Sequence, residues 1–242
     1  MKSNNRTVII IPTYNHLDDC LKPCIESLMQ TTHLDYNEGS MIVVVANGCT
    51  DGTHDYLHDM SEKYEWFHYR AIPEQLGYTK AMNIGISVAL GIQADIDLFI
   101  LLNNDTVMMP QEKDRWIDIL AEGMKYDDSG ISGPVKKNDE ATGLPFIIFF
   151  CAMIHREVFE MIGLLDEVFS PGFGEDIDFC TKALKAGYAS VQVPEQDQLG
   201  MNGKNFTGGF PIYHAGTKTF GEYDGYDEVV KRNIEILKQR YC

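Results

Sequence analysis

The first half of the chain alternates between short, uniformly apolar runs and longer segments with the 3.6-residue period of amphipathic helices. The apolar runs are Thr7–Ile11, Met41–Ala46, Trp66–Ile72 and Asp97–Leu102, and the periodic segments are Asp18–Gln30, Asp51–Lys63, Thr79–Leu90 and Gln111–Tyr126. Strands that are apolar on both faces are buried between helices, and alternating helices provide the crossovers of a parallel sheet. The sequence therefore predicts an α/β fold with a mostly parallel sheet and helices on both faces.

The second half of the chain is less regular. We expect strands at Ile131–Val135 and Phe146–Ile154 and helices at His155–Ile162, Asp176–Ala186 and Tyr226–Tyr241. The Gly- and Asn-rich segment Gln198–Phe210 is typical of a mobile loop. The last helix carries its apolar residues on one stripe, which predicts packing either on its own domain or on a partner and leaves a homo-oligomer open.

The net charge of the chain limits the classes of partner that it can bind. There are 20 Lys and Arg residues against 36 Asp and Glu residues, a formal net charge of −16. This balance argues against a broad basic face and so disfavours nucleic acid and anionic lipid as partners, although a local basic patch remains open. An acidic chain that binds phosphate groups must use a few placed cations, exposed backbone N–H groups or a metal ion.

Cysteine use and hydropathy indicate the compartment. None of the six cysteines belongs to a Cys-x-x-Cys pair, and a chain of 242 residues buries enough surface to fold without disulfides. Free thiols are typical of a reducing compartment, so we expect a cytoplasmic protein. The longest apolar run, Phe146–Ile154, is far shorter than the ~20 residues that a membrane-spanning helix needs, which predicts a chain without a transmembrane segment.

Polar and small residues follow each of the four predicted parallel strands. These segments are Pro12–Asn15, Asn47–Thr53, Gln75–Asn83 and Asn103–Thr106. One such segment is ordinary turn chemistry, but the carboxyl ends of parallel strands meet at one edge, where ligands bind in open α/β sheets. Four of them together favour a binding crevice at that edge.

Two of these segments suit a ligand that carries phosphate groups. Asn47–Thr53 is consistent with a helix cap formed by Thr50 or Asp51, and a phosphate-binding loop needs the same exposed N–H groups at a helix start. Lys80 and Asn83 lie on one face of the third predicted helix. A lysine there is either a solvated surface residue or a ligand contact.

A candidate metal ligand follows the fourth strand. Asp105 brings a carboxylate to the edge of the sheet with no neighbouring cation in the sequence, and a divalent cation held by such a carboxylate can bridge to a diphosphate. The alternative is a turn cap. His214 follows an apolar stretch and precedes a glycine, which is a weaker signal for a ligand.

A cluster of acidic residues opens a helix in the second half. Glu175, Asp176 and Asp178 follow the apolar, Gly-rich approach Phe169–Gly174, as if the turn were packed into the protein. Like-charged neighbours and burial raise the pKa of a carboxyl group, which suits a general base. The alternative is a favourable interaction of acidic side chains with the helix dipole.

In order and spacing, these motifs resemble the GT-A fold glycosyltransferases, in particular the large inverting family 2. The resemblance covers residues 7–216 and rests on IPTYN at 11–15, NGCTDGT at 47–53, LGYTKAMNIG at 76–85, LLNNDT at 101–106, REVFEMIGLLDE at 156–167, GEDIDF at 174–179 and YHAG at 213–216. It implies a GT-A domain over 1–216, with a nucleotide-binding half at 1–106 and an acceptor and catalytic half at 107–216. Residues 217–242 would form a C-terminal helical extension.

The resemblance also implies roles for individual residues. Asp176 would be the general base that deprotonates the acceptor hydroxyl, with Glu175 beside it, and Asp105 and His214 would hold Mn²⁺ or Mg²⁺ on the diphosphate. Gln198–Phe210 would act as a lid. The nucleotide-diphospho-sugar donor would be contacted by Pro12, Thr13, Tyr14, Asn15, Asn47, Asp51, Gly77, Lys80, Asn83, Asn103 and Asn104.

Three positions depart from the family pattern. The family's usual Asp-Asp pair after the second strand is Ala46-Asn47 here, and the arginine often found before the helix asparagine is Met82, for which Lys80 would substitute. The metal motif reads Asn-Asn-Asp at 103–105, as in rhamnosyltransferase-like members.

The sequence thus predicts a metal-dependent inverting glycosyltransferase that moves a hexosyl or pentosyl group to the hydroxyl of a glycan or another polymer. Three alternatives stay open at this point: a sugar-nucleotide or glycan-binding protein without turnover, a nucleotidyltransferase, and a transferase that glycosylates a modified DNA base. The segment Pro12–Asn15 argues against the nucleotidyltransferase, because such an enzyme would have a basic Gly-rich loop there.

Overall fold

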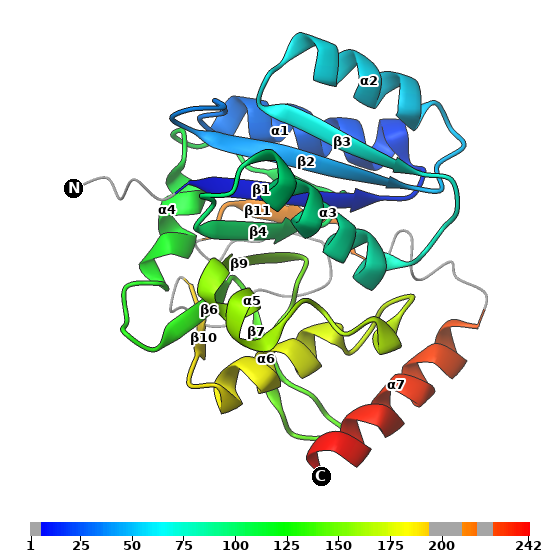
Figure 1. The fold of residues 1–242 in the computed structure, drawn as a ribbon, viewed down its shortest axis with the longest axis vertical. Helices are drawn as coiled ribbons and strands as arrows, with labels where there is room; N and C mark the ends of the chain where they lie inside the picture. Colours follow the sequence, from blue (N-terminus) through cyan, green and yellow to red (C-terminus); the bar gives the residue numbers. More distant parts are fainter. Residues whose placement is uncertain (1–5, 194–209, 217–224) are drawn as a thin grey trace.

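The computed structural model describes residues 6–193, 210–216 and 225–242, and Figure 1 shows the arrangement of its elements. The predicted loop and lid at Gln198–Phe210 lie outside the described residues except for Phe210, which is fully buried. The fold is an α/β fold, as the alternation of apolar and periodic segments predicts.

A seven-stranded sheet forms the centre of the molecule, in the order β10-β6-β9-β4-β1-β2-β3. Its strands are β1 (Thr7–Thr13), β2 (Ser40–Asn47), β3 (Phe67–Ile72), β4 (Leu98–Leu102), β6 (Ser129–Gly133), β9 (Cys151–His155) and β10 (Ala189–Gln192). All neighbouring pairs are parallel except those of β9, which runs antiparallel to both β4 and β6. The sheet is therefore mixed but mostly parallel.

Helices cover both faces of this sheet (Figure 1). One face packs on η1 (Leu17–Leu21), α1 (Lys22–Thr31), α2 (Thr53–Lys63) and α4 (Arg115–Glu122), and the other packs on α3 (Tyr78–Ile92), α5 (Arg156–Ile162) and α6 (Glu175–Lys185). Ile9 and Ile11 of β1 face the first layer, whereas Val8 and Ile10 face the second. The alternation of side chains along each strand thus builds two apolar cores, which explains why the central strands are apolar throughout.

The predicted strand Phe146–Ile154 proves to be two strands, and this part of the prediction is wrong. β8 (Pro145–Ile147) pairs with β7 (Lys136–Asn138) in a separate hairpin, and the chain rejoins the main sheet only at β9. Between them, the backbone carbonyl of Phe149 accepts from the Tyr78 hydroxyl and that of Phe150 accepts from the Asn103 N–H. The apolar run leaves the sheet because its backbone bonds to other elements, which hydrophobic periodicity does not reveal.

The predicted helix Gln111–Tyr126 is also too long, since α4 spans only Arg115–Glu122. Asp114 precedes it with a φ of 66°, and its carboxylate accepts a hydrogen bond from the His33 N–H. This anchor delays the start of the helix. The sequence analysis also missed the short pair of β5 (Thr106–Met108) and β11 (Ile212–His214), which are antiparallel to each other.

The last helix, α7, spans Tyr226–Tyr241 as its periodicity predicts. Leu237 packs with Phe169 and Ile177 in a third, smaller core cluster, so α7 packs on its own chain next to α6 (Figure 1). None of the helices within the described ranges is long and apolar enough to cross a membrane.

Candidate active site

The loops after β1 and β2 are joined by hydrogen bonds at the carboxyl edge of the sheet. Asn15 adopts a left-handed conformation with a φ of 52°, and its side-chain oxygen accepts from the Thr50 N–H at 2.7 Å. The Cys49 thiol lies 3.4 Å from the carbonyl oxygen of Thr13, to which it donates. Pro12 and Thr13 are buried, whereas Tyr14 and Asn15 are half-buried and remain available to a ligand.

Asp51 holds the same corner together from the start of α2. Its carboxylate accepts from the Leu17 N–H at 3.0 Å and from the Thr53 hydroxyl at 2.6 Å. Partial burial opposes ionisation, but these hydrogen bonds outweigh it and lower the pKa of Asp51 below its ordinary value. The predicted cap by Thr50 or Asp51 is wrong, because the N-cap residue of α2 is Gly52, which has no side chain. The Asp51 carboxylate is nevertheless engaged within the chain, since it also accepts from the Thr53 N–H at 3.4 Å.

Asn47 organises the third loop. Its side-chain oxygen accepts from the Leu76 N–H at 2.8 Å, and its amide nitrogen donates to the Gly77 carbonyl at 3.3 Å. Gly77 has a φ of 84°, and a Cβ added there would overlap the Cα of Pro171. Only glycine fits at this point, because the loop approaches a segment almost a hundred residues away in the chain.

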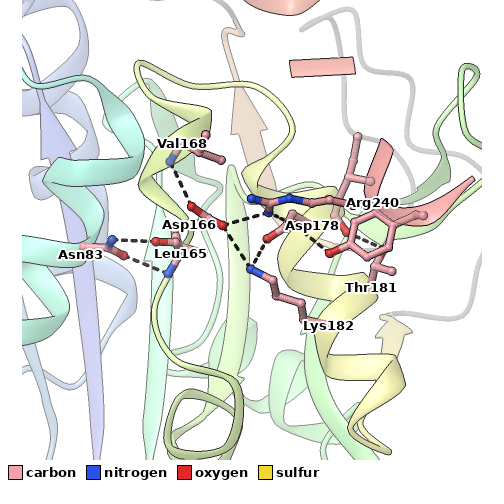
Figure 2. Close-up of polar contacts among 10 residues, drawn as sticks. Asn83, Leu165, Asp166, Val168, Asp178, Thr181, Lys182 and Arg240 are labelled. Atoms are coloured by element: carbon pink, nitrogen blue, oxygen red, sulfur yellow. Dashed lines mark hydrogen bonds and ion pairs between the residues drawn. The ribbon is translucent and has the colours of Figure 1, made fainter. Parts of the chain in front are cut away.

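Asn83 lies on α3 but connects it to the second half of the chain rather than presenting a free amide. Its amide nitrogen donates to the Leu165 carbonyl at 2.8 Å, and its oxygen accepts from the Leu165 N–H at 3.1 Å, as Figure 2 shows. The side chain is 6% exposed. Lys80, one turn earlier, is half-buried.

The segment after β4 brings the candidate metal ligands together. Asn104 donates to the Thr13 hydroxyl at 2.8 Å and so links β4 to β1. Asp105 Oδ1 lies 3.1 Å from His214 Nε2, and the amide nitrogen of Asn103 lies 3.5 Å from the same ring atom. The pairing of β5 with β11 explains this contact, because it places His214 opposite Thr106, one residue after the carboxylate.

A stacked aromatic ring fixes the plane of the His214 imidazole. The rings of Phe150 and His214 are 4.3 Å apart between centroids and only 4° from parallel. Phe150 itself is held because its carbonyl accepts from the Asn103 N–H at 2.9 Å. The histidine is therefore presented edge-on to Asp105.

The donor set here fits a hard divalent cation. Asn103 Oδ1 is a buried oxygen with no donor among the described residues, and Asp105 Oδ1, also buried, has His214 Nε2 at 3.1 Å but outside hydrogen-bond geometry. Buried polar atoms are normally satisfied, so two such oxygens beside an imidazole nitrogen indicate a missing ligand. Carboxylate and amide oxygens with one histidine suit Mn²⁺ or Mg²⁺.

The acid pair Glu175 and Asp176 opens α6 after a turn with two left-handed residues, Phe173 with a φ of 74° and Gly174 with a φ of 94°. Burial raises the pKa of both carboxyl groups, and the charge of Asp176 raises that of Glu175 further. Asp176 Oδ1 accepts from the Ile177 N–H at 2.9 Å, and this bond and the nearby Phe149 backbone both lower the pKa of Asp176 without cancelling the effect of burial. Glu175 is 7% exposed, and within the described parts of the chain its Oε2 atom has no hydrogen-bond partner.

Asp178 does not belong to this pair, although the sequence groups the three acids. It is buried on the opposite side of α6, where Lys182, Arg240 and Tyr241 surround its carboxylate at 2.7–2.8 Å. Figure 2 shows Asp166 beside it, bonded to the same arginine. Asp178 is thus an ion-paired anchor for α7, and the expectation that it handles a proton is wrong.

Sequence reasoning missed the segment that joins the two candidate centres. The backbone of Phe149 lies near Asp176, its carbonyl accepts from Tyr78, and the adjacent Phe150 stacks on His214. The sequence does show two adjacent aromatic residues, Phe149 and Phe150, in the apolar run Phe146–Ile154, but such a run is equally typical of an ordinary buried strand.

Comparison with solved structures identifies the fold of this chain. The α/β fold with its mixed seven-stranded sheet is that of the GT-A glycosyltransferases. A mannosyltransferase of Pyrobaculum calidifontis, PcManGT, solved with GDP-Man and Mn²⁺, matches with a TM-score of 0.63 and 18% identity over 80% of this chain and 56% of that one. GalNAc-T7, solved with UDP, GalNAc and Mn²⁺, matches with a TM-score of 0.66 and 13% identity over 80% of this chain and 43% of that one.

The family model of glycosyl transferase family 2 matches residues 8–132, just over half of the chain, so the protein belongs to that family. The uncharacterized glycosyltransferase YibD of Escherichia coli strain K12 is 30% identical over 120 residues. These residues are 47% of this chain and 33% of YibD, so the chain matches about a third of that relative's length.

Proposed function

We propose that the chain is a metal-dependent inverting glycosyltransferase that transfers a sugar from a nucleotide-diphospho-sugar to an acceptor hydroxyl, with Asp176 as the general base. The observation that carries the proposal is the shared segment Phe149–Phe150, because one of its residues contacts Asp176 and the other contacts His214. A candidate base and a candidate metal site are therefore adjacent. This adjacency is what a displacement next to a diphosphate requires.

The donor side is built from the loops after β1, β2 and β3. Half-buried Tyr14 and Asn15 and the half-buried Lys80 would contact the nucleotide, while Asn47 and Asp51 would keep their loops in place. The Asn103–Asp105 motif suits the rhamnosyltransferase-like subgroup.

A divalent cation, held by Asp105 and His214 with the Asn103 oxygen nearby, would supply positive charge to the leaving diphosphate. The mannosyltransferase and GalNAc-T7 structures named above each contain Mn²⁺, which supports this cofactor. Such a cation would also explain how a chain with a net charge of −16 binds a negatively charged diphosphate, because the chain has few cationic side chains of its own.

The remaining chemistry depends on Asp176. The acceptor oxygen attacks the anomeric carbon, the bond from that carbon to the diphosphate oxygen breaks with its electron pair, and the acceptor proton passes to the Asp176 carboxylate. Attack from the face opposite the leaving group inverts the anomeric centre. A base works best when its pKa is close to the working pH, and burial raises the pKa of Asp176 toward neutrality.

The test measures nucleoside diphosphate release from UDP-glucose, UDP-N-acetylglucosamine, GDP-mannose and dTDP-rhamnose, each with Mn²⁺, with and without a panel of hydroxyl acceptors. We expect release with one donor, stimulated by an acceptor. In Asp176→Asn, kcat should fall by about 10²–10⁴-fold while donor binding by calorimetry stays within twofold.

Three results would overturn the proposal. Binding of a donor without turnover would make the chain a binding protein, and release of pyrophosphate from a sugar phosphate and a nucleoside triphosphate would make it a nucleotidyltransferase. Full activity of Asp176→Asn would remove the base assignment. Stimulation only by DNA with a hydroxymethylated base would change the acceptor class.

A further inference from the structure

The C-terminal helix α7 makes an unusual set of contacts through one buried residue. The amide nitrogen of Asn233 donates to the carbonyl oxygens of Phe169, Gly172 and Phe173 at 3.1, 3.0 and 2.7 Å. Asn233 is fully buried, and its side-chain oxygen accepts from Arg232 Nε at 2.9 Å. Its two amide hydrogens are thus shared among three carbonyls of one loop, which we call the 168–174 loop.

Two arginines of α7, Arg232 and Arg240, make further hydrogen bonds to the same loop and to its flanking residues. Arg232 donates to the carbonyls of Val168 and Ser170, so α7 supplies donors to five carbonyl oxygens of the 168–174 loop. Arg240 anchors the two ends by bonding Asp166 before the loop and Asp178 after it (Figure 2). Backbone carbonyls buried without a donor cost free energy, so the conformation of this loop depends on α7.

The 168–174 loop lies between the two halves of the candidate site. The carbonyl of Pro171 accepts from the Tyr78 N–H at 2.6 Å, at the start of α3, and Pro171 is the residue against which Gly77 packs. At its other end the loop passes directly into Glu175 and Asp176. A shift of this loop therefore moves the donor-side turn and the base together.

We propose that Asn233 is a positioning residue for glycosyl transfer, which acts by holding the 168–174 loop so that Asp176 and the Gly77 turn keep their relative places. This inference rests on the proposed role of Asp176. It extends the functional site to α7, which lies beyond the part of the chain that the family model matches.

A purely structural role is the competing explanation, because α7 also packs through Leu237 on Phe169 and Ile177. That packing would hold α7 in place without any special demand on residue 233. The two explanations differ in what an Asn233 variant does. A structural role changes stability, whereas a positioning role also changes kcat in the folded enzyme.

The experiment compares Asn233→Ala with two controls in the full chain. Ser132→Ala removes a buried hydrogen bond from β6 to the Leu120 carbonyl of α4, and Lys238→Ala removes an exposed ion pair on α7 itself. Arg232→Met, at an exposed position, is the second test variant in case Asn233→Ala does not fold. Turnover is measured with whichever nucleotide sugar of the panel above is active, and amide hydrogen exchange is measured without any ligand.

For Asn233→Ala we expect kcat to fall about 10–100-fold with the donor KM within threefold, because a small misplacement of reacting groups costs this much. The amides of Tyr78 and Asp178 should exchange about tenfold faster, while those of β1 and β2 stay unchanged.

The acid limb of the kcat profile should move to lower pH, since a looser loop admits water to the acid pair. That pair faces Tyr78 on α3 and Asp139 in the β7–β8 hairpin. Arg232→Met should give the same changes at smaller size.

Unchanged amide exchange at Tyr78 and Asp178 in both variants would overturn the inference, whatever the activity. Faster exchange with an unchanged kcat would reduce Asn233 to a structural residue and would also overturn it. If instead Asp176→Asn keeps full activity, the proposed function fails, and the exchange data still report on the loop alone.

Discussion

The polar residues at the carboxyl edge of the sheet fall into two groups that differ in how their oxygen atoms are satisfied. In the donor-side loops, Asn15, Asn47 and Asp51 accept hydrogen bonds from the backbone of a neighbouring loop. On the acid side, Glu175 buries an oxygen with no donor among the described residues, and Asp105 buries one that faces His214 Nε2 at 3.1 Å without hydrogen-bond geometry. The first group joins the loops to one another, whereas under the proposed function the second group would bind a metal ion and the reacting groups.

The same difference sets the pKa of the carboxylates. Hydrogen bonds lower the pKa of Asp51, whereas burial raises the pKa of Glu175 and Asp176. Substitutions in the donor-side loops should therefore lower stability. Substitutions on the acid side should lower activity with little loss of stability, and in one case with a gain.

The largest effect is expected from Asp105→Ala. It removes the only carboxylate in the Asn-Asn-Asp motif, so kcat with saturating donor should fall by about 10²–10³-fold and the Mn²⁺ concentration for half-maximal activity should rise. His214→Ala should show the same pattern at smaller size. Metal titration of turnover and of thermal unfolding checks both variants, and full activity in EDTA would contradict the metal role.

Gly77→Ala tests the donor side. The new Cβ would overlap Pro171 in a left-handed conformation, so the free energy of unfolding should fall by roughly 2–3 kcal/mol. Gly143→Ala is a matched control, because Gly143 has a similar φ of 73° with open space around it. It should therefore cost only the conformational part, about 1 kcal/mol. Equal losses in urea unfolding would show that the contact with Pro171 is unimportant.

Glu175→Gln should be stabilising at high pH. A buried acid with a raised pKa favours the folded state when protonated, so its stability contribution is lost as pH rises and the group ionises. The glutamine cannot ionise, and the variant should gain roughly 1–2 kcal/mol over the parent at pH 9 and converge with it below pH 4.5, the ordinary pKa of the group. A difference independent of pH would show that Glu175 is not buried as described.

Asp51→Asn should give the smallest effect, with the opposite sign. The lowered pKa of Asp51 contributes stability above its unfolded pKa, and this contribution is lost as pH falls through its folded pKa. The variant should be about 0.5–1 kcal/mol less stable at pH 7 from the weakened hydrogen bonds, and this deficit should be smaller at pH 3. Urea unfolding at both pH values is the measurement.

The sequence predicted the fold and its first four parallel strands well, because β1, β2 and β4 are apolar and all four strands are bounded by turn residues. It also predicted the full extent of α7. It could not separate Asp178 from Glu175 and Asp176, since three acids within one helical turn look alike until their neighbours in space are known. Two of the three partners of Asp178, Arg240 and Tyr241, come from α7, more than fifty residues later.

The break in the run Phe146–Ile154 was equally invisible. Its apolar residues are consistent with a single strand. Only the contacts of Phe149 and Phe150 with Tyr78, Asn103 and His214 explain why the strand ends after Ile147. The residues joining the two candidate centres were missed for that reason. Phe149 and Phe150 make many of their contacts through backbone atoms, and the residue type does not reveal which partners the backbone will bond.

The donors that α7 gives to the 168–174 loop also set an order for folding during synthesis. The parallel strands β1 to β4 can pair while the ribosome is still producing the second half, because domains fold from the N-terminal side as they emerge. Asn233 leaves the ribosome well after the 168–174 loop that it holds. A nascent chain therefore completes the loops after β1, β2 and β3 before the turn that leads into Glu175 and Asp176, so premature termination before α7 would leave the first half folded and this turn unformed.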